Sequence, residues 1–399
     1  MARSDQAGPL VAIRLPAPAA AEQVRRCWDE GEAVAVLDPR APAAVTEGAL
    51  ARVQPTHVVD GDGRRAHPEG RPAPAGVVAV VLTSGTTGDP KAVELTAAGR
   101  DAIGRGFAQA LGVGPDDRWL VCLPLHHVAG LAILGRSQAA GFQVVTQDGF
   151  DANAVAAAPD RDGATIVSLV PTTLARLTEA GAPLDRFRRI VTGGAPLPPV
   201  VRAGAEARGA RVVDTYGLSE TWGGVILDGS ALPGAEAMIA DDGELLVRGP
   251  MVMRGYRFDE SATATAFTPD GWFRTGDVGR VELDGRIVIT DRRRDVIITG
   301  GVNVSPTAVE AVLADHPNVA DVCVTGKPDE EWGDRVIAYV VPREPRRPPS
   351  LDELRAFAYE RLSAAQLPRE VVVIDEVPRT PGGKTLRRLI DGPVGQERE

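Results

Sequence analysis

Residues 78–95 read VAVVLTSGTTGDPKAVEL, and the rest of the chain is interpreted outward from them. An apolar run ends at Leu82, and each of the next six residues is a glycine or carries a hydroxyl group. Glycines let backbone N–H groups turn toward one centre, and Thr and Ser add hydroxyl donors. The pattern therefore predicts a buried strand that ends in a phosphate-binding loop. The predicted contacts are Thr83, Ser84, Gly85, Thr86, Thr87, Gly88 and the cation Lys91.

This loop differs from the phosphate loop of the common NTPases. That loop requires Gly-Lys-Ser/Thr, whereas Gly88 is followed by Asp89 and Pro90. A proline at this position prevents a helix from beginning on the phosphates. The alternative interpretation is a surface turn rich in Ser, Thr and Gly. We favour phosphate binding because the donors directly follow a buried strand.

Length and composition restrict the class of protein. A chain of 399 residues fits two or three domains, and 44% hydrophobic with 25% charged residues is typical of a globular protein. The net charge of -10 argues against a general nucleic-acid-binding protein. The cysteines Cys27, Cys122 and Cys323 are far apart, which favours buried thiols in a reducing compartment. Because we find neither a signal peptide nor an apolar run of about 18 residues, we expect a cytoplasmic protein without a membrane span.

Further strands are expected within 118–130, 162–171, 189–198 and 211–221. Each ends in a polar or glycine-rich segment. Repeated strands of this kind predict a doubly wound α/β sheet whose ligand lies beyond the carboxyl ends of the strands. In the last segment, Tyr216 can stack on an aromatic base and Glu220 is a hard oxygen ligand suited to magnesium.

Two histidines, His126 and His127, follow the first of these strands. Without a third ligand at zinc-like spacing, a histidine at the mouth of an apolar pocket is favoured over a metal site. Arg136 lies in the helix-like stretch that comes next. Its spacing leaves two interpretations open: an arginine inside a pocket that needs an anionic partner, or one on the solvent face of an amphipathic helix.

From about residue 235 the pattern changes to short strands and turns, which predict a small β-rich subdomain over about 235–291. Within it, Asp277 either binds a ribose diol or forms an Asx turn. The run DRRRD at 291–295 lies at a composition boundary and is interpreted as a hinge, with a solvated surface as the alternative. Residues 292–399 form a small α+β module that presents Lys384 on a glycine turn. We therefore expect an α/β protein: a large N-terminal domain of doubly wound sheets over 1–291, including the subdomain, and a separate C-terminal domain.

Seven motifs occur in order: TSGTTGDPK, LPLHHVAG, TGGAPL, DTYGLSET, GWFRTGD, the DRRRDVIITGGVNV run and TPGGK. Each resembles a successive signature of the adenylate-forming superfamily, which contains acyl-CoA synthetases, luciferases and adenylation domains. The resemblance covers about residues 76–390. It implies an AMP-forming acid–thiol ligase that uses ATP, Mg²⁺ and CoA. It also implies a mobile C-terminal domain that rotates between adenylation and thiol transfer.

The same resemblance implies roles for individual residues. The catalytic set is Lys384, which bridges the carboxylate and the α-phosphate, with His127, Thr86 and the metal ligand Glu220. Beyond the phosphate loop, the ATP-binding set is Gly194, Ala195, Pro196, Asp214, Thr215, Tyr216, Gly217, Ser219, Asp277 and Arg292. The acid-binding set is His127, Arg136, Gly193, Gly217 and Leu218. The CoA-binding set is Thr299, Gly300, Gly301 and Asn303, and the hinge residues are Asp291 and Arg294. Two positions depart from the family pattern: Arg294, usually Asp or Lys, and Ala92, usually Gly.

Within the superfamily, HHVAGLAILGRS and TYGLSETWGGVILDG most resemble the 2-succinylbenzoate-CoA ligases of menaquinone synthesis. In that group an arginine nine residues after the pocket histidine helps to bind the second carboxylate, and Arg136 lies nine residues after His127. The expected partners are a small carboxylic acid, ATP and CoA, without nucleic acid, and a homodimer is possible. The alternatives are a CoA ligase for another aryl or aliphatic acid and an adenylation enzyme that loads a carrier protein. A non-catalytic homologue is disfavoured by the intact Lys384 and Glu220.

Overall fold

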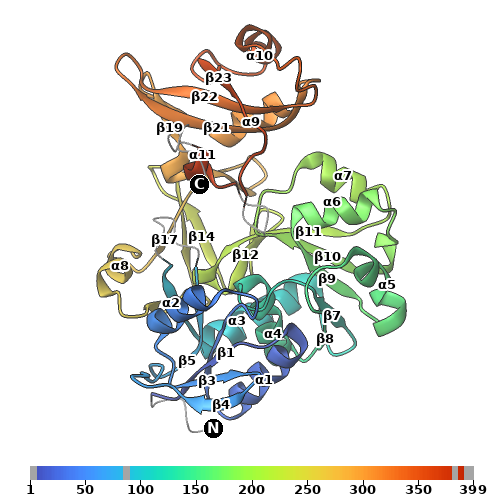
Figure 1. Ribbon diagram of the computed structural model, residues 1–399, viewed down its shortest axis with the longest axis vertical. Helices are drawn as coiled ribbons and strands as arrows, with labels where there is room; N and C mark the ends of the chain where they lie inside the picture. Colours follow the sequence, from blue (N-terminus) through green and yellow to red (C-terminus); the bar gives the residue numbers. More distant parts are fainter. Residues whose placement is uncertain (1–6, 84–89, 380–384, 391–399) are drawn as a thin grey trace. The chain divides into compact units, whose positions relative to one another are not determined.

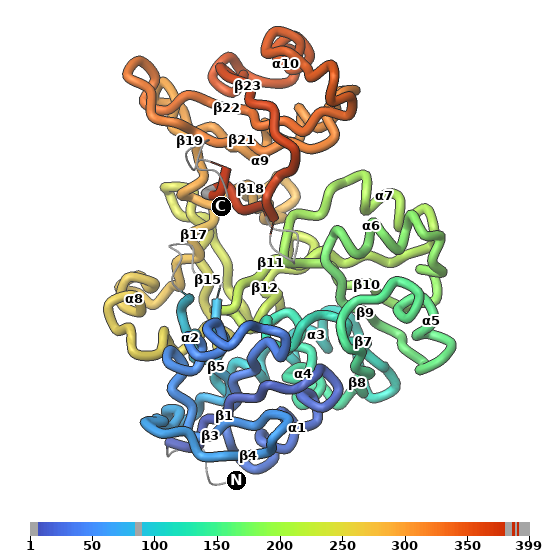
Figure 2. Tube along the Cα trace, in the orientation of Figure 1, coloured from blue at the N-terminus to red at the C-terminus, as the bar shows by residue number. Residues whose placement is uncertain are grey.

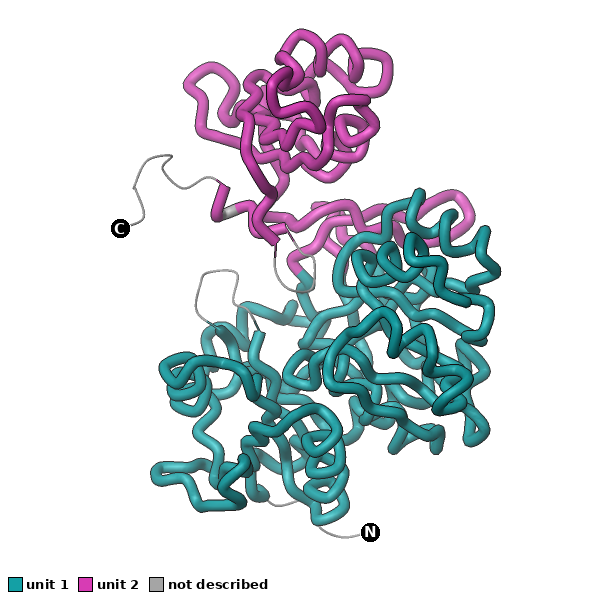
Figure 3. Tube along the Cα trace, turned by 45° about the vertical axis from the view of Figure 1, so that its right-hand side comes forward, with its two compact units in different colours: residues 1–238, 246–275 teal, residues 239–245, 276–399 magenta. Residues whose placement is uncertain are grey.

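The structure is a computed structural model that describes residues 7–83, 90–379 and 385–390. The chain divides into two compact units (Figure 3). Unit 1 consists of residues 1–238 and 246–275, and unit 2 consists of residues 239–245 and 276–399. Each unit is described by itself below. The domain boundary near residue 291 and the hinge at 291–295 stay predictions.

The first sheet of unit 1 begins with the N-terminal strands (Figure 1). Its strands are β1 (Leu10–Ile13), β2 (Ala33–Val36), β3 (His57–Asp60), β4 (Gly63–Ala66), β5 (Val77–Leu82), β6 (Ala92–Thr96) and β16 (Gly255–Tyr256). They lie in the order β16-β6-β5-β2-β1-β3-β4. The neighbours from β5 to β3 are parallel, and antiparallel strands flank them. The strand predicted before the phosphate loop is confirmed as β5.

The second sheet of unit 1 carries most of the predicted nucleotide-binding segments. Its strands are β7 (Arg118–Val121), β8 (Gln143–Thr146), β9 (Ile166–Leu169), β10 (Arg189–Gly193), β11 (Val212–Leu218), β12 (Gly223–Leu227) and β13 (Ser230–Ala231). They lie in the order β13-β12-β11-β10-β9-β7-β8, and the five strands from β11 to β8 are parallel. Parallel strands end at one edge of a sheet, so the segments after β9, β10 and β11 are neighbours.

Helix α4 covers one face of the second sheet, and α5, α6 and α7 cover the other. All the described helices of unit 1 are α1 (Ala17–Asp29), α2 (Ala43–Val53), α3 (Ala97–Leu111), α4 (Val128–Ala140), α5 (Ala152–Asp162), α6 (Pro171–Glu179), α7 (Pro199–Glu206) and α8 (Glu260–Thr265), with 3-10 turns η1 (Leu184–Arg186) and η2 (Ser219–Thr221). Helices α3 and α4 pack together; α3 contacts β6 of the first sheet, and α4 contacts β7, β8 and β12 of the second. This helix pair therefore lies between the two sheets.

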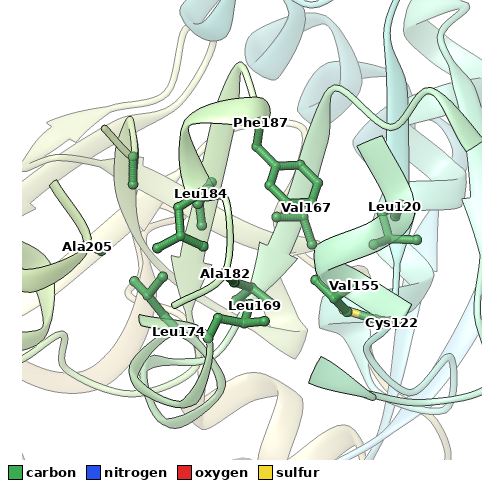
Figure 4. Close-up of a cluster of buried hydrophobic side chains, with 14 of the residues drawn as sticks. Leu120, Cys122, Val155, Val167, Leu169, Leu174, Ala182, Leu184, Phe187 and Ala205 are labelled. Carbon is green, nitrogen blue, oxygen red and sulfur yellow. The ribbon is translucent and has the colours of Figure 1, made fainter. Parts of the chain in front are cut away.

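A hydrophobic core fills the space between the second sheet and the helices α5, α6 and α7 (Figure 4). It includes Leu120, Val155, Val167, Leu169, Leu174, Leu184, Phe187, Ile190 and Ala205. Each fully buried Val, Leu, Ile or Phe stabilises the fold by about 1.5–3 kcal/mol relative to an exposed side chain. The strand residues of this core have a nearly continuous apolar pattern because helices cover both faces of the sheet.

Local sequence determines the ends of α3. The hydroxyl group of Thr96 accepts a hydrogen bond from the Gly99 N–H at 3.0 Å, which satisfies a donor that the first helical turn leaves without a partner. At the other end, Gly112 adopts a left-handed conformation with φ 64°. The sequence itself predicts this helix, since Thr96 is a typical N-cap residue and Gly112 a typical residue after a helix end, and the structure confirms it.

Unit 2 contains the C-terminal module. A four-stranded sheet of β14 (Glu236–Ile239), β15 (Glu244–Arg248), β17 (Phe273–Val281) and β18 (Ile287–Arg292) is crossed by the division between the units. The remaining elements are η3 (Arg293–Asp295), β19 (Ile297–Thr299), β20 (Val302–Val304), α9 (Pro306–Ala314), β21 (Val319–Asp329), β22 (Gly333–Pro342), α10 (Leu351–Ala358), β23 (Glu370–Val373) and α11 (Arg387–Ile390). Figure 2 traces their path in orange and red. The strands form a sheet in which β22 lies between β19 and β21 and also pairs with β23.

These two units confirm the predicted α/β class with a separate α+β C-terminal module. The sequence S-L-D-E at 350–353 predicts a capping box, which is present, and Ser305 caps α9. The sequence pattern also predicts two separate short strands at 272–274 and 278–283, which was wrong. They are one strand, β17, because a bulge after Val278 lets the chain continue past it. In the described part of the chain no helix is long and apolar enough to cross a membrane.

Replacing the Thr96 cap with alanine tests how α3 begins. We expect Thr96→Ala to lower the free energy of unfolding by about 1 kcal/mol, because the Gly99 N–H loses its acceptor. Urea denaturation followed by circular dichroism measures this difference. The control is Thr265→Ala, whose hydroxyl group bonds only to backbone carbonyls within the exposed helix α8. Equal losses in the two variants would contradict the capping role.

Candidate active site

The ends of β10 and β11 approach each other closely. In the parallel register Gly193 lies opposite Thr215, and the Thr215 hydroxyl group donates to the Thr192 carbonyl at 2.8 Å. A Cβ atom at Gly193 would lie only 2.6 Å from Thr215 Oγ1, so a side chain there would force the strands apart. The glycine predicted for acid binding therefore has a packing requirement as well.

The segment after β10 presents backbone rather than side chains. Gly194 has φ 84°, a conformation that favours glycine, and Gly194 and Pro196 are exposed while Ala195 is half-buried. On the neighbouring strand, Tyr216 is half-buried and lies opposite Ile226 of β12. A flat turn and an aromatic ring at adjacent strand ends are suited to holding a planar base.

The carboxylate of Asp214 belongs to the same strand end. Its pKa is raised above the usual value, first by burial and then by the nearby Asp228 carboxylate. The backbone N–H of Asp214 donates to Asp228 at 3.1 Å, and the Asp228 N–H donates to the Asp214 carbonyl at 2.8 Å. These bonds join β11 to the residue that follows β12, at the end of this strand pair away from the 3-10 turn.

Glu220 lies in that turn, η2. The turn ends at Trp222, which has φ 55°, is fully buried, and donates from its indole Nε1 to the Thr96 carbonyl at 3.1 Å. Trp222 thereby anchors the turn to the N-terminus of α3. Glu220 Oε1 accepts a hydrogen bond from the Tyr256 hydroxyl group at 2.9 Å.

Lys91 approaches the same tyrosine from the phosphate-loop side. Its Nζ lies 4.4 Å from the centre of the Tyr256 ring, a cation–π distance. The Thr83 N–H donates to the Lys91 carbonyl at 2.9 Å, which continues the pairing of β5 with β6. Lys91, Tyr256 and Glu220 are therefore connected, whereas the predicted contacts Ser84, Gly85, Thr86, Thr87 and Gly88 lie outside the described residues.

The Glu220 carboxylate suits magnesium. Magnesium is usually bound through one or two carboxylates together with substrate phosphates and water rather than in a cage of protein ligands. The described ranges contain no group of three or more His, Cys, Asp or Glu side chains that could hold a metal ion.

His127 is the N-cap residue of α4, and its ring lies 4.4 Å from the His126 ring, centre to centre. It is exposed at the surface, yet desolvation by the surrounding protein, followed by the neighbouring His126, lowers its pKa below the usual 6.5. At neutral pH the imidazole of His127 is therefore uncharged.

Arg136 lies on the inner side of α4 and is 4% exposed, which excludes the solvent-face interpretation. Its Nε is buried without a hydrogen-bond partner, and within the described ranges no carboxylate forms an ion pair with it. Its guanidinium carbon lies 3.6 Å from the centre of the Phe107 ring. Burial lowers the pKa of Arg136 to about 9, so at pH 7 this buried side chain is a cation. A buried charge of this kind needs an anion.

Gly217, which the sequence analysis predicts to bind the acid, lies close to this cation. Gly217 and Leu218 pair with Gly224 and Gly223 across β11 and β12. A Cβ atom at Gly217 would overlap the Gly223 carbonyl oxygen, and one at Gly223 would lie 3.3 Å from Arg136 Nη2. The structure thus brings Arg136, Gly217 and Leu218 to one short stretch of the sheet.

Ser219, a predicted ATP contact, is the first residue of η2, and the other predicted residues not yet placed lie in unit 2 or outside the described residues. Asp277 and Arg292 are cross-strand partners on β17 and β18, with 2.8 Å between Arg292 Nε and Asp277 Oδ1. Asp291 accepts a hydrogen bond from the Thr307 N–H at 3.1 Å, and Arg294 is exposed beside Asp295.

The CoA-binding prediction falls on the β19–β20 hairpin. Gly300, Gly301 and Asn303 are exposed there, but Thr299 is 1% exposed. The catalytic prediction Lys384 lies outside the described residues. All these roles stay predictions.

Two aromatic residues were missed by the sequence analysis. Tyr256 reaches Glu220 because β16 pairs with β6, with Tyr256 opposite Val93. Phe107 reaches Arg136 because α3 packs on α4. A lone tyrosine after a glycine and a phenylalanine at a buried helical position are common patterns, so neither gave a usable signal.

Comparison with known proteins agrees with these arrangements. A family model described as AMP-binding enzyme matches residues 5–257, and one described as AMP-binding enzyme C-terminal domain matches residues 308–384. The 2-succinylbenzoate--CoA ligase of Bacillus licheniformis is 37% identical over 336 residues, which cover 78% of this chain and 69% of the relative.

Two solved structures of one Bacillus subtilis protein, the o-succinylbenzoate CoA synthetase (MenE), are also similar. The complex with the acyl-adenylate intermediate OSB-AMP has a TM-score of 0.85 and 30% identity, covering 98% of this chain and 90% of that one. The complex with ATP and magnesium ion has a TM-score of 0.83 and 29% identity, covering 96% and 90%.

Replacing Arg136 tests whether its buried positive charge lacks a neutralising partner in the folded protein. We expect Arg136→Met to raise the free energy of unfolding by about 1–3 kcal/mol, because an apolar side chain of similar length removes a buried charge without an ion-pair partner. The control is Arg100→Met on α3, since Arg100 has the polar partners Asp101 and Gln138 and should not be stabilised by the change. A clear loss of stability in Arg136→Met would contradict this reading.

The pH dependence tests the protonation state of His127. Because burial lowers the pKa of His127 to about 4, the group stays uncharged from pH 6.5 to 8.5, and its titration adds no step to activity there. We expect kcat/KM of the wild type and of His127→Gln to change in parallel over this interval. A step near pH 7 that only the wild type shows would mean that the pKa is not lowered.

Proposed function

Because the chain belongs to the AMP-binding enzyme family, we propose that it is an ATP-dependent ligase that joins 2-succinylbenzoate to CoA through an acyl-adenylate. The observation that supports this choice of substrate is Arg136. It is a buried cation without an ion-pair partner in the described ranges, and it lies beside the glycines of β11 and β12. An aromatic acid with a second carboxylate supplies the missing anion. The names of the relatives support the same acid.

In the first half-reaction a carboxylate oxygen of the acid attacks the α-phosphorus of ATP. The new O–P bond replaces the bond to pyrophosphate, which leaves, and the product is an acyl-AMP. No protein nucleophile is needed, so the protein acts by positioning and by stabilising charge. We assign the charge stabilisation to Lys384 and the phosphate contacts to the segment from Thr83 to Lys91.

Magnesium has a ligand in Glu220, whose carboxylate the Tyr256 hydroxyl group orients at 2.9 Å. Bound there with the phosphates of ATP, the ion would offset their negative charge. The ammonium group of Lys91 lies over the ring of the same tyrosine. We therefore add Tyr256 to the site as the residue that keeps Glu220 and Lys91 near each other without a direct ion pair that would neutralise both.

In the adenine and ribose region we keep the predicted roles. Gly194, Ala195 and Pro196 provide a flat backbone surface and Tyr216 an aromatic face. Asp277 accepts from the ribose hydroxyl groups, and its partner Arg292 holds the carboxylate in place at 2.8 Å.

In the second half-reaction the thiol sulfur of CoA attacks the carbonyl carbon of the acyl-AMP. A C–S bond forms, the C–O bond to AMP breaks, and the thiol proton passes to solvent. We propose that the hairpin residues Gly300, Gly301 and Asn303 contact CoA after a rotation about residues 291–295. The alternatives are a phosphopantetheine arm on a carrier protein as the acceptor, or another aryl or aliphatic acid as the substrate.

Pyrophosphate release with ATP and magnesium tests the function. The panel contains 2-succinylbenzoate, benzoate, salicylate and a medium-chain fatty acid, each with and without CoA. We expect release only with the dicarboxylate, and the CoA ester when CoA is present. Release with a monocarboxylate would keep the chemistry and overturn the substrate, and no release with any acid would overturn adenylation.

Lysine variants test the catalytic assignment. We expect Lys384→Ala to slow acyl-adenylate formation at least about 100-fold, because a preorganised positive charge is lost from the transition state. Lys327→Ala is the matched control, since Lys327 lies on β21 with its ammonium group over the Tyr339 ring. If the two variants were equally active, Lys384 would not be the catalytic lysine.

A further inference from the structure

The guanidinium group of Arg136 rests on aromatic rings. Its Cζ lies 3.6 Å from the centre of the Phe107 ring and 5.6 Å from that of Trp119. Phe107 is 1% exposed and Trp119 is fully buried, so water does not screen this interaction. A cation over an aromatic face is attracted by the negative charge of the ring face, and the attraction is strongest where both are desolvated.

An aromatic support differs from a carboxylate in what it leaves available. The five N–H donors of a guanidinium group point outward in its plane, and a carboxylate partner would occupy some of them. A ring stacked on the flat face holds the group through its charge and leaves the in-plane donors for another acceptor. The buried Nε of Arg136, which has no hydrogen-bond partner, agrees with this arrangement.

The Phe107 ring is itself held from two sides. Trp119 lies at 6.1 Å, centre to centre, and its indole Nε1 donates to the Ser168 hydroxyl group at 3.0 Å. On β12, a Cβ atom at Gly224 would lie 3.2 Å from Phe107 Cζ, so the ring tip reaches the strand backbone. Gly224 pairs with Gly217, a residue of the acid-binding set.

We propose that Phe107 is a positioning residue for acid recognition: its ring holds the Arg136 guanidinium group charged, flat and with its donors available for the second carboxylate of the acid. This inference rests on the proposed function of Arg136. The requirement explains why an aromatic residue on α3, rather than an acidic one, faces the buried cation. An acidic residue there would stabilise the fold but would compete with the substrate for the same donors.

The variant Phe107→Leu tests the proposal because it keeps an apolar side chain and removes the ring face. We expect the KM for 2-succinylbenzoate to rise about tenfold and the KM for ATP to stay unchanged. The matched control is Phe187→Leu, which removes an equally buried ring from the core behind the second sheet (Figure 4). It should lose comparable stability and leave both KM values unchanged.

The outcomes distinguish the role of Phe107 from the role of Arg136. If Phe107→Leu and Phe187→Leu have the same KM for the acid, Phe107 is only a core residue and the inference is overturned. If Arg136→Met also leaves that KM unchanged, Arg136 does not bind the acid, and the proposed substrate contact is itself overturned.

A second variant covers the case in which Phe107→Leu does not fold. Phe107→Met also removes the ring face, and its flexible unbranched side chain fills a buried space more readily than leucine does. We expect it to raise the KM for the acid about tenfold with the KM for ATP unchanged. An unchanged KM for the acid in a folded Phe107→Met protein would contradict the proposal.

Discussion

The hydrogen bond from Trp222 to the Thr96 carbonyl connects the two parts of the site in unit 1. Thr96 ends β6 in the first sheet and caps α3, whereas Trp222 follows the turn that carries Glu220 in the second sheet. The indole of Trp222 is fully buried and held in one position, because it packs against Gly99 and Gly135 on the two helices between the sheets. Glu220, the proposed metal ligand, and β6 are therefore held in a fixed position relative to each other.

A second constraint is the charge of Arg136. Burying a cation without a carboxylate costs stability, and folding alone would favour an apolar residue there. Aromatic stacking on Phe107 offsets part of this cost without using the donors. A position that is unfavourable for stability and suited to an anion is expected where binding of a substrate, rather than folding, sets the residue.

Sequence reasoning succeeded where the signal was local. The cap at Thr96, the capping box at Ser350 and Glu353, and the strand before the phosphate loop all depend on residues within a few positions of one another. It failed where the partner came from a distant segment. Tyr256 contacts Glu220 through the pairing of β16 with β6, and nothing near Tyr256 in the chain indicates that pairing.

By itself the sequence determined the α/β class, because hydrophobic periodicity, glycines and caps act over short distances. The seven motifs in order indicated the family by resemblance, and the AMP-binding enzyme model over residues 5–257 confirms it. It left open whether Arg136 faces solvent or a pocket. Only the tertiary structure decided this, by packing α3 against α4 so that the guanidinium group is enclosed on the face of Phe107. Burial is a property of several distant segments together, and therefore it cannot be read from the spacing within one of them.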